Sequence, residues 1–357
     1  MRVRSSARGS CLVTNRVLCL QSSNSVRVGL IANPASGRDL RRLVSGASVF
    51  TTSEKVHVAR RLFSGFGAVG VARVLVMPDS AGLSLGISRA AVQHRPQLTG
   101  RWPEIEVLKF EQCNSAVDSV IAAREMVARG VGAIVVLGGD GTARAVASAC
   151  GDTPMLALST GTNNAFGITV DGTVAGLAAG LVSTGACAVA EVCYRAKKLI
   201  VRHRDRTEIA LVDVAIIDQD RVGARAVWDP DLVRELAVTF AEPHAVGLSA
   251  IAGAVSPCDR REPSGRLLRM GDGRTVLAAV APGLMRSVPV AAHAALVPGQ
   301  PVELSTSRGV IALDGEREMV FHADDPRPTV ELSLDGPLVI DVEATMAIAA
   351  QRSLLVR

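Results

Sequence analysis

The chain has 357 residues, of which 48% are hydrophobic and only 3% aromatic, and its formal net charge is +5. This length favours two domains, with cores built mainly of Val, Leu, Ile and Ala. The scarcity of aromatic rings argues against stacking platforms for single-stranded nucleic acid. The arginines are scattered or paired rather than gathered in a run, so we expect no nucleic-acid partner. Lysine is rare and occurs only at positions 55, 109, 197 and 198.

The sequence also argues against a membrane-spanning protein and against a disulfide-rich protein. No apolar run reaches the roughly 18–20 residues that a membrane-spanning helix needs, so we expect no membrane partner. The seven cysteines include no C-x-x-C pair and no cluster with histidine that has zinc spacing. We therefore expect buried free thiols and a cytoplasmic protein, because the cytoplasm keeps thiols reduced.

The first 25 residues contain four arginines and no acid, and their apolar stretch at residues 17–20 is short for a secretory signal. A targeting peptide is one interpretation. We favour a disordered extension or a mis-assigned start codon for residues 1–25.

The first half of the chain alternates buried strands and helices. Expected strands are residues 26–32, 71–77, 105–110, 133–137 and 154–158, and expected helices are 54–69, a segment capped by Asn114, and one starting near Ala143. This alternation predicts a doubly wound α/β nucleotide-binding domain over residues 26–184. In such sheets ligands bind at the carboxyl ends of the strands.

After about residue 185 short extended runs dominate. They are residues 186–192, 199–203, 208–217, 276–281, 302–305, 310–313 and 329–334, with a helical patch at 231–240. We expect a mainly β, sandwich-like domain over residues 185–335. A strand at 338–342 and a helix at 344–354 are expected to return to the first domain within residues 336–357.

The strongest motif is the run Gly138-Gly139-Asp140-Gly141-Thr142, between a buried strand and a helix. Glycines let backbone N–H groups approach a phosphate, and the helix N-terminus favours an anion. A carboxylate repels phosphates, so its presence here indicates a chemical role. It can accept a proton from an attacking hydroxyl or hold Mg²⁺. A tight turn capped by Asp140 is the structural alternative.

Two rival glycine motifs do not match. A Walker A loop requires Gly-Lys-Ser/Thr, which is absent. A dinucleotide-binding fingerprint starting at Gly139 would need a third glycine where Arg144 stands. A nicotinamide-dependent dehydrogenase is therefore not expected.

Two other polar loops follow predicted strands. Asn33-Pro34-Ala35-Ser36-Gly37 follows the first strand, and a run from Ser159 to Asn164 follows the fifth. Each alone is also interpretable as an ordinary turn or polar loop, but three such loops at one sheet edge favour a nucleotide. The candidate nucleotide and phosphate ligands are Asn33, Ser36, Gly37, Gly138, Gly139, Gly141, Thr142, Thr160, Gly161, Thr162, Asn163 and Asn164.

The β region carries two candidate acidic sites. Asp213 lies in an apolar strand, where a carboxyl group is costly unless it is paired or functional. It either contacts an acceptor hydroxyl or ribose, or sits at a strand end in solvent. Asp314-Gly315-Glu316 is foremost a hairpin-turn signal.

These motifs, in this order, resemble the ATP-NAD kinase superfamily, which includes diacylglycerol and sphingosine kinases. Over roughly residues 26–350 the chain is more similar to one branch, the acetoin-catabolism protein X group. The stretches that select this branch are residues 31–39, Arg41-Arg42, Ser48-Val49-Phe50, Met77-Pro78-Asp79 and Gly161-Thr162-Asn163-Asn164.

The resemblance implies an active site in the cleft between the α/β and β domains, in a phosphotransferase that uses ATP (or polyphosphate), Mg²⁺ and a hydroxyl acceptor. It maps Asp140 onto the catalytic aspartate and Asp213 onto an acid that binds the acceptor. NAD kinases carry Asn before that acid, whereas this chain has Val212. NAD, giving NADP, is the default acceptor. The alternatives are another small hydroxyl compound of acetoin-type carbon catabolism, or a non-catalytic nucleotide-binding accessory protein.

The resemblance also implies a homo-oligomer. The metal ligands are not identified by the sequence.

Overall fold

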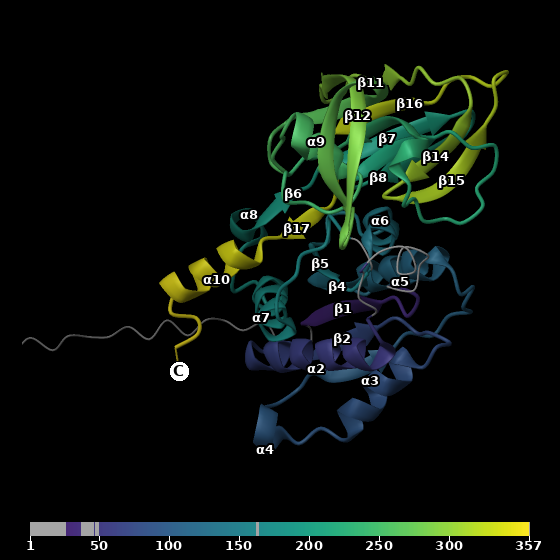
Figure 1. The fold of residues 1–357 in the computed structure, drawn as a ribbon. Helices are drawn as coiled ribbons and strands as arrows, with labels where there is room; N and C mark the ends of the chain where they lie inside the picture. The colour runs from purple at the N-terminus through teal and green to yellow at the C-terminus, as the bar shows by residue number, and fades with distance from the viewer. Residues whose placement is uncertain (1–25, 37–45, 47–49, 162–163, 357) are drawn as a thin grey trace, which may run out of the picture.

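The computed structural model describes residues 26–36, 46, 50–161 and 164–356. An α/β part with a parallel sheet carries a second part made of largely antiparallel sheets (Figure 1). The fold class predicted from the sequence is confirmed.

The α/β part is organised around one seven-stranded sheet in the order β3-β2-β1-β4-β5-β17-β6. All neighbouring pairs are parallel except β17 and β6. Its strands are β1 (Arg27–Ala32), β2 (Arg73–Val76), β3 (Glu104–Val107), β4 (Ala133–Gly138), β5 (Met155–Ser159), β6 (Cys193–Arg195) and β17 (Leu338–Ile340). The central strands β1 and β4 are buried on both faces, as continuous apolar runs require.

Helices cover both faces of this sheet. One face packs against α2 (Thr52–Ala68), α3 (Leu83–Val92), α7 (Gly172–Ser183) and α10 (Val342–Gln351), and the other against α5 (Ala116–Ala128) and α6 (Asp140–Ala147). The short α4 (Pro96–Thr99) precedes β3. Helices α2 and α7 approach closely through glycine, since a Cβ on Gly65 would lie 2.5 Å from the Thr173 carbonyl oxygen.

The second part pairs a six-stranded sheet with a four-stranded sheet, in the orders β12-β11-β10-β9-β14-β15 and β13-β16-β7-β8. The strands are β7 (Lys198–His203), β8 (Arg206–Ala210), β9 (Asp213–Ile217), β10 (Val233–Val238), β11 (Gly265–Ala281), β12 (Leu284–Leu296), β13 (Val302–Glu303), β14 (Gly309–Leu313), β15 (Glu316–Phe321) and β16 (Thr329–Ser333). An apolar core lies between the two sheets, and α9 (Ser249–Val255) packs on the other face of the larger one. The long β11–β12 hairpin reaches back to the α/β part, where Gly46 N donates to Pro282 O over 2.8 Å.

Three local predictions in the second half are wrong. The expected single run 208–217 is divided between β8 and β9, which belong to different sheets. Residues 231–240 form β10, preceded by the single 3₁₀ turn η1 (Pro230–Leu232), rather than a helix. Strand β10 is central and packs against both apolar cores. Its sequence therefore does not show the alternation of apolar and polar residues that indicates a strand. In the expected run 186–192, Val189–Val192 instead form the short helix α8.

Three boundaries also differ. Ser115, rather than Asn114, caps α5, and Asn114 has a left-handed φ of 52°. Helix α6 begins at Asp140 rather than near Ala143, so the glycine run is itself the helix start. Strand β6 falls within residues 185–335 yet joins the seven-stranded sheet, because it provides the outer partner for β17.

Within the described residues no helix is both long and apolar enough to cross a bilayer. The five described cysteines are all free thiols. Cys150, Cys187 and Cys258 are buried as expected, whereas Cys113 is exposed.

Two of the four lysines are buried, and each donates hydrogen bonds to three backbone carbonyl oxygens. Lys55 on α2 is 0% exposed, and its Nζ donates to the carbonyl oxygens of Asn33 (2.9 Å), Pro34 (3.3 Å) and Ser36 (2.9 Å). An ammonium group has three donors on one nitrogen and therefore suits carbonyls that converge on one point. Lys55 therefore fixes the turn that follows β1.

Replacing Lys55 with Met should lower the free energy of unfolding by about 3 kcal/mol, because buried carbonyls lose a charged donor. Urea unfolding monitored by circular dichroism measures this loss. The matched control is Lys109→Met, at an exposed lysine, which should change stability by less than about 0.5 kcal/mol. Equal effects at the two positions would contradict the assigned role of Lys55.

Candidate nucleotide and acceptor site

The three polar loops predicted from the sequence meet at the carboxyl ends of β1, β4 and β5. Asn33 Nδ2 donates to Thr142 Oγ1 over 2.8 Å, which joins the first loop to the glycine run. The hydroxyls of Ser36 and Thr160 lie 3.2 Å apart, which joins the first loop to the third. Asn164 Nδ2 donates to Ser159 Oγ over 2.7 Å within the third loop.

Three predicted ligands, Gly37, Thr162 and Asn163, lie outside the described residues.

The described glycines of these loops allow the loop backbones to approach closely. A Cβ on Gly161 would lie 2.9 Å from the Cα of Gly139 and 2.4 Å from Asn164 Oδ1. A Cβ on Gly138 would lie 2.6 Å from that of Thr142. Side chains at these positions would push the loops apart, so glycine is required for the loops to meet. Phosphate binding by Gly138, Gly139, Gly141, Thr142 and Thr160 stays a prediction.

Asp140 is the first residue of α6 and is 7% exposed. Its carboxylate accepts hydrogen bonds from the backbone N–H groups of Ala165 (2.8 Å) and Phe166 (3.0 Å), with that of Gly167 at 3.5 Å. These bonds fix the orientation of the carboxylate and tie the glycine run to residues 165–167. Asp140 therefore does more than cap a turn.

The two candidate acids of the β part are both buried beside Asp140. Asp213 is 5% exposed, which excludes a strand end in solvent, and its Oδ1 accepts from Gly315 N over 3.2 Å. Asp314 and Gly315 have φ values of 51° and 73° and form the β14–β15 hairpin turn that the sequence predicted. Asp314 Oδ1 also accepts from Leu211 N (2.9 Å) and Val212 N (2.8 Å).

Asp140, Asp213 and Asp314 line one small cavity of about 20 Å³ between the two parts of the molecule. Its other lining residues include Val212 and Ser249. The Ser249 hydroxyl is fully buried and has no hydrogen-bond partner within the described part of the chain. This cavity has room for about one water-sized group.

Arg144 links the glycine helix to this acidic hairpin. Its Nε lies 3.4 Å from Asp314 Oδ2, and its Nη2 donates to Glu318 Oε1 over 2.7 Å. Burial raises the pKa of Asp314 well above its usual range; the Arg144 guanidinium opposes this shift and the Asp213 carboxylate adds to it. Through its contacts with Asp314 and Glu318, Arg144 therefore bridges the two parts of the molecule.

A larger cavity of about 410 Å³ adjoins the glycine run. It extends from Asn33 and Thr142 to Asp79 after β2 and to Ser115 at the start of α5, and Glu316 closes it from the β part. Its position outside the carboxyl ends of parallel strands is where open α/β sheets bind ligands. Its volume lies within the range of about 300–1,000 Å³ found for small-molecule sites.

Comparison with known proteins gives the family. Residues 28–185 match the ATP-NAD kinase N-terminal domain, and residues 197–335 match the acetoin catabolism protein X C-terminal domain. The chain is 41% identical to the acetoin catabolism protein X of Cupriavidus necator over 337 residues, which are 92% of this chain and 93% of that protein. The chain belongs to the acetoin catabolism protein X family.

The predicted resemblance is thereby confirmed, together with an NAD kinase-like, two-domain fold. The family match makes this a kinase-like nucleotide-binding protein.

The roles of Lys55, which supports the first loop, and of Arg144 and Asp314 at the domain junction were not predicted from the sequence. Lys55 was seen only as a rare lysine, and Arg144 only as a departure from a glycine motif. Asp314 was interpreted foremost as a turn residue. The available signals were a lysine retained in an arginine-rich chain and an acid directly following an apolar strand. Neither signal identifies the partner, which comes from a distant part of the chain.

Asp314 should give this protein a characteristic pH dependence. Its folded pKa lies above the unfolded value near 3.8, so its contribution to stability is full below that pH and is lost as the pH rises through the folded pKa. In Asp314→Asn this titration is absent. The unfolding free energy of the variant minus that of the wild type should therefore increase from about pH 4 toward neutrality.

Urea unfolding at several pH values measures this difference. The matched control is Asp272→Asn, at an exposed aspartate. A difference for Asp314→Asn that does not change with pH would show that the carboxyl group is ionised at the same pH in both states.

Proposed function

We propose that this protein is a kinase that transfers the terminal phosphoryl group of ATP to a hydroxyl group of a small acceptor, with NAD as the first acceptor to test. The observation that carries this proposal is the convergence of Asp140, Asp213 and Asp314, from two domains, on one cavity beside the glycine run. Buried acids that converge in a cleft are candidates for a functional site.

The larger cavity is the proposed ATP site. Asn33 and Thr142 would bind phosphate oxygens there, and the N-terminus of α6 favours an anion. ATP carries Mg²⁺, which neutralises phosphate charge. Within the described residues no cluster of three or more metal-binding side chains occurs. Mg²⁺ typically takes one or two carboxylates and otherwise phosphates and water, so Asp213 would hold it on this chain while Asp140 stays available to the acceptor hydroxyl.

In the proposed reaction an acceptor oxygen forms a bond to the terminal phosphorus while the bond from that phosphorus to ADP breaks. Asp140 orients the acceptor hydroxyl and takes its proton, which is later lost to solvent. Because Ala165 N and Phe166 N hold the carboxylate, its direction is set before the acceptor arrives. Positioning of this kind supplies most of the catalysis in phosphoryl transfer.

The size of the acidic cavity bears on the acceptor. At about 20 Å³ it admits a hydroxyl group but not a dinucleotide. Binding of NAD would require the 246–249 segment or the domains to move apart, and Val212 offers no hydrogen bond where NAD kinases carry Asn. A small hydroxyl compound requires less movement. The name of the relative, acetoin catabolism protein X, supports an acceptor from acetoin-type carbon catabolism as the alternative.

A second candidate function is a nucleotide-binding accessory protein without turnover. Val212 favours it, because this buried side chain offers no hydrogen bond at the position where NAD kinases carry the Asn that binds the acceptor. A cytoplasmic location, a homo-oligomeric state and the absence of nucleic-acid and membrane partners remain predictions.

The first test mixes purified protein with Mg²⁺-ATP and NAD and detects NADP with a coupled dehydrogenase. NADP from the wild type, with none from Asp140→Ala, would support the NAD kinase assignment. If no NADP forms while ATP still binds, NAD is excluded as the acceptor. The result would then favour another small hydroxyl compound as the acceptor, or an accessory protein without turnover.

With whichever acceptor turns over, Asp140→Asn should lower kcat by at least about 10²-fold, because the amide orients the hydroxyl but cannot take its proton. Steady-state kinetics measures this effect, with Asp272→Asn as the exposed control. A fully active Asp140→Asn enzyme would remove Asp140 from the catalytic role.

A further inference from the structure

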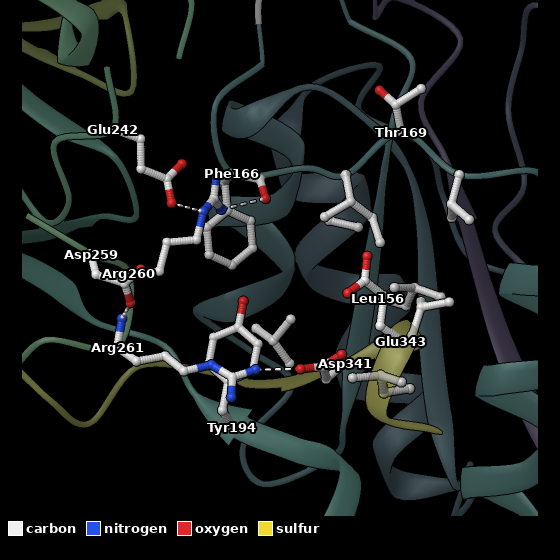
Figure 2. A pocket seen from close by; sticks show the side chains of 16 residues that line it. Leu156, Phe166, Thr169, Tyr194, Glu242, Asp259, Arg260, Arg261, Asp341 and Glu343 are labelled. Atoms are coloured by element: carbon white, nitrogen blue, oxygen red, sulfur yellow. Dashed lines mark hydrogen bonds and ion pairs between the residues drawn. The ribbon is translucent and has the colours of Figure 1, made fainter. Parts of the chain in front are cut away.

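A separate cavity of about 350 Å³ opens where strands β5 and β17 diverge (Figure 2). These parallel strands share a single register pair, Met155 with Val339. Residues 168–170 line the gap that results, with Ile168 bridged to Leu158. In α/β proteins ligands often bind outside the carboxyl ends of parallel strands and at domain interfaces. None of the site residues predicted from the sequence lines this cavity.

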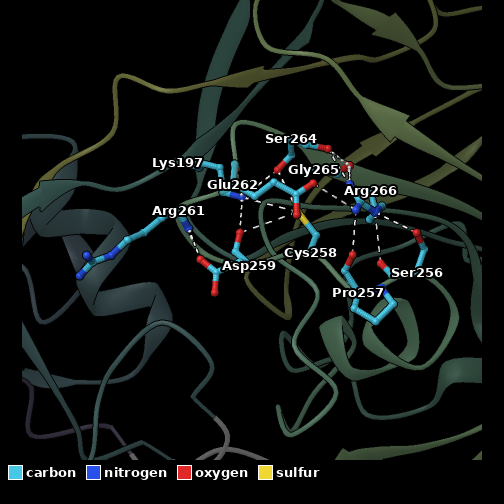
Figure 3. Close-up of polar contacts among 10 residues, drawn as sticks. All are labelled: Lys197, Ser256, Pro257, Cys258, Asp259, Arg261, Glu262, Ser264, Gly265 and Arg266. Carbon is cyan, nitrogen blue, oxygen red and sulfur yellow. Dashed lines mark hydrogen bonds and ion pairs between the residues drawn. The ribbon is translucent and has the colours of Figure 1, made fainter.

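The wall contributed by the β domain is rigid. Lys197 is buried, and its Nζ donates to the carbonyl oxygens of Asp259 (2.8 Å), Glu262 (2.8 Å) and Ser264 (2.7 Å) (Figure 3). Arg266 donates to the carbonyl oxygen of Pro257 over 2.7 Å in the same loop. These charge-assisted bonds hold the loop that presents Arg260 and Arg261 to the cavity.

Both of these arginines are already neutralised. Arg260 Nε donates to Glu242 over 2.9 Å, and its guanidinium lies 4.1 Å from the ring centroid of Phe240. Arg261 donates to Asp341 and lies 4.6 Å from the ring centroid of Tyr194. An anionic ligand would therefore have to displace a carboxylate that is in place.

The charge left over in the cavity is negative. Two arginines face four acids among its lining residues, a difference of −2. Glu343, in the first turn of α10, is exposed to solvent, lines the cavity and makes no ion pair with any described residue. In Figure 2 its carboxylate and the Tyr194 hydroxyl face the same hollow. The wall between them is apolar and includes Leu156, Ile168 and Val339.

We propose that this cavity is a second small-molecule site, which binds an organic cation with an apolar body. The apolar wall and the edge of the Tyr194 ring contact the body, and the Glu343 carboxylate pairs with the charge. Because Arg261 already lies over the Tyr194 ring, the charge of the ligand is assigned to Glu343 alone.

The segment that holds the Asp140 carboxylate also borders this cavity. Arg260 donates to the carbonyl oxygens of Ala165 and Phe166, and the N–H groups of the same two residues donate to Asp140. Phe166 itself lines the cavity. A ligand bound there contacts the segment that orients the proposed catalytic carboxylate. Its binding would therefore change the mobility or orientation of that carboxylate.

The test titrates the full-length protein with benzyltrimethylammonium, benzyl alcohol and phenylacetate, three probes that share a ring and differ in charge. Calorimetry should show millimolar binding of the cation, the range expected for a ligand of this size. The neutral probe should bind at least about fivefold more weakly, and the anion should not bind.

Glu343→Gln should weaken cation binding by about fivefold, and Tyr194→Ala by at least as much, whereas Glu111→Gln, at an exposed glutamate outside the cavity, should leave it unchanged. Equal affinity for the three probes, no saturable cation binding up to about 10 mM, or insensitivity to both cavity variants would overturn the proposal.

Hydrogen–deuterium exchange gives a readout without enzymatic activity. Saturation with the cation should slow exchange in residues 164–170, and unchanged exchange there would exclude the link to Asp140. Since neither readout requires turnover, a failure of this site is distinguishable from a failure of the proposed kinase activity.

Discussion

The site depends on the hydrogen bonds from Ala165 and Phe166 to the Asp140 carboxylate. They turn the carboxylate at the start of α6 toward the junction of the domains and hold the loop after β5 against the glycine run. On the other side of that loop, Arg260 of the β domain binds the carbonyl oxygens of the same two residues. Two peptide groups thus connect the glycine run, the β domain and the second cavity.

Two buried lysines likewise hold loops in place through backbone groups. Lys55 holds the turn after β1, and Lys197 holds the loop that carries Arg260 and Arg261, in each case through three backbone carbonyls. The cations of this chain are otherwise almost all arginines. Arg266 also binds three carbonyls, but it uses Nε and both Nη atoms, whereas each buried lysine reaches its three carbonyls from a single nitrogen.

The sequence predicted the local features of the site correctly where one segment carried the whole signal. The glycine run lies between β4 and α6, and Asp314-Gly315 forms a hairpin turn. Strand β10 was mistaken for a helix because both of its faces are buried, which removes the alternation that marks a strand. The further role of Asp314 was not predictable from its neighbours, since its partners Arg144 and Val212 lie at least 102 residues away.

By itself, the sequence determined the fold class, the family and the order of the three loops, because buried strands, glycine turns and polar loop ends are written in short stretches of chain. Only the tertiary structure decided that Asp140, Asp213 and Asp314 share one cavity of about 20 Å³, and that β5 and β17 part to open another. Those facts depend on how two domains pack and on which strand the C-terminal segment joins. Pairings between distant segments are set by the packing of the whole chain, and no local pattern records them.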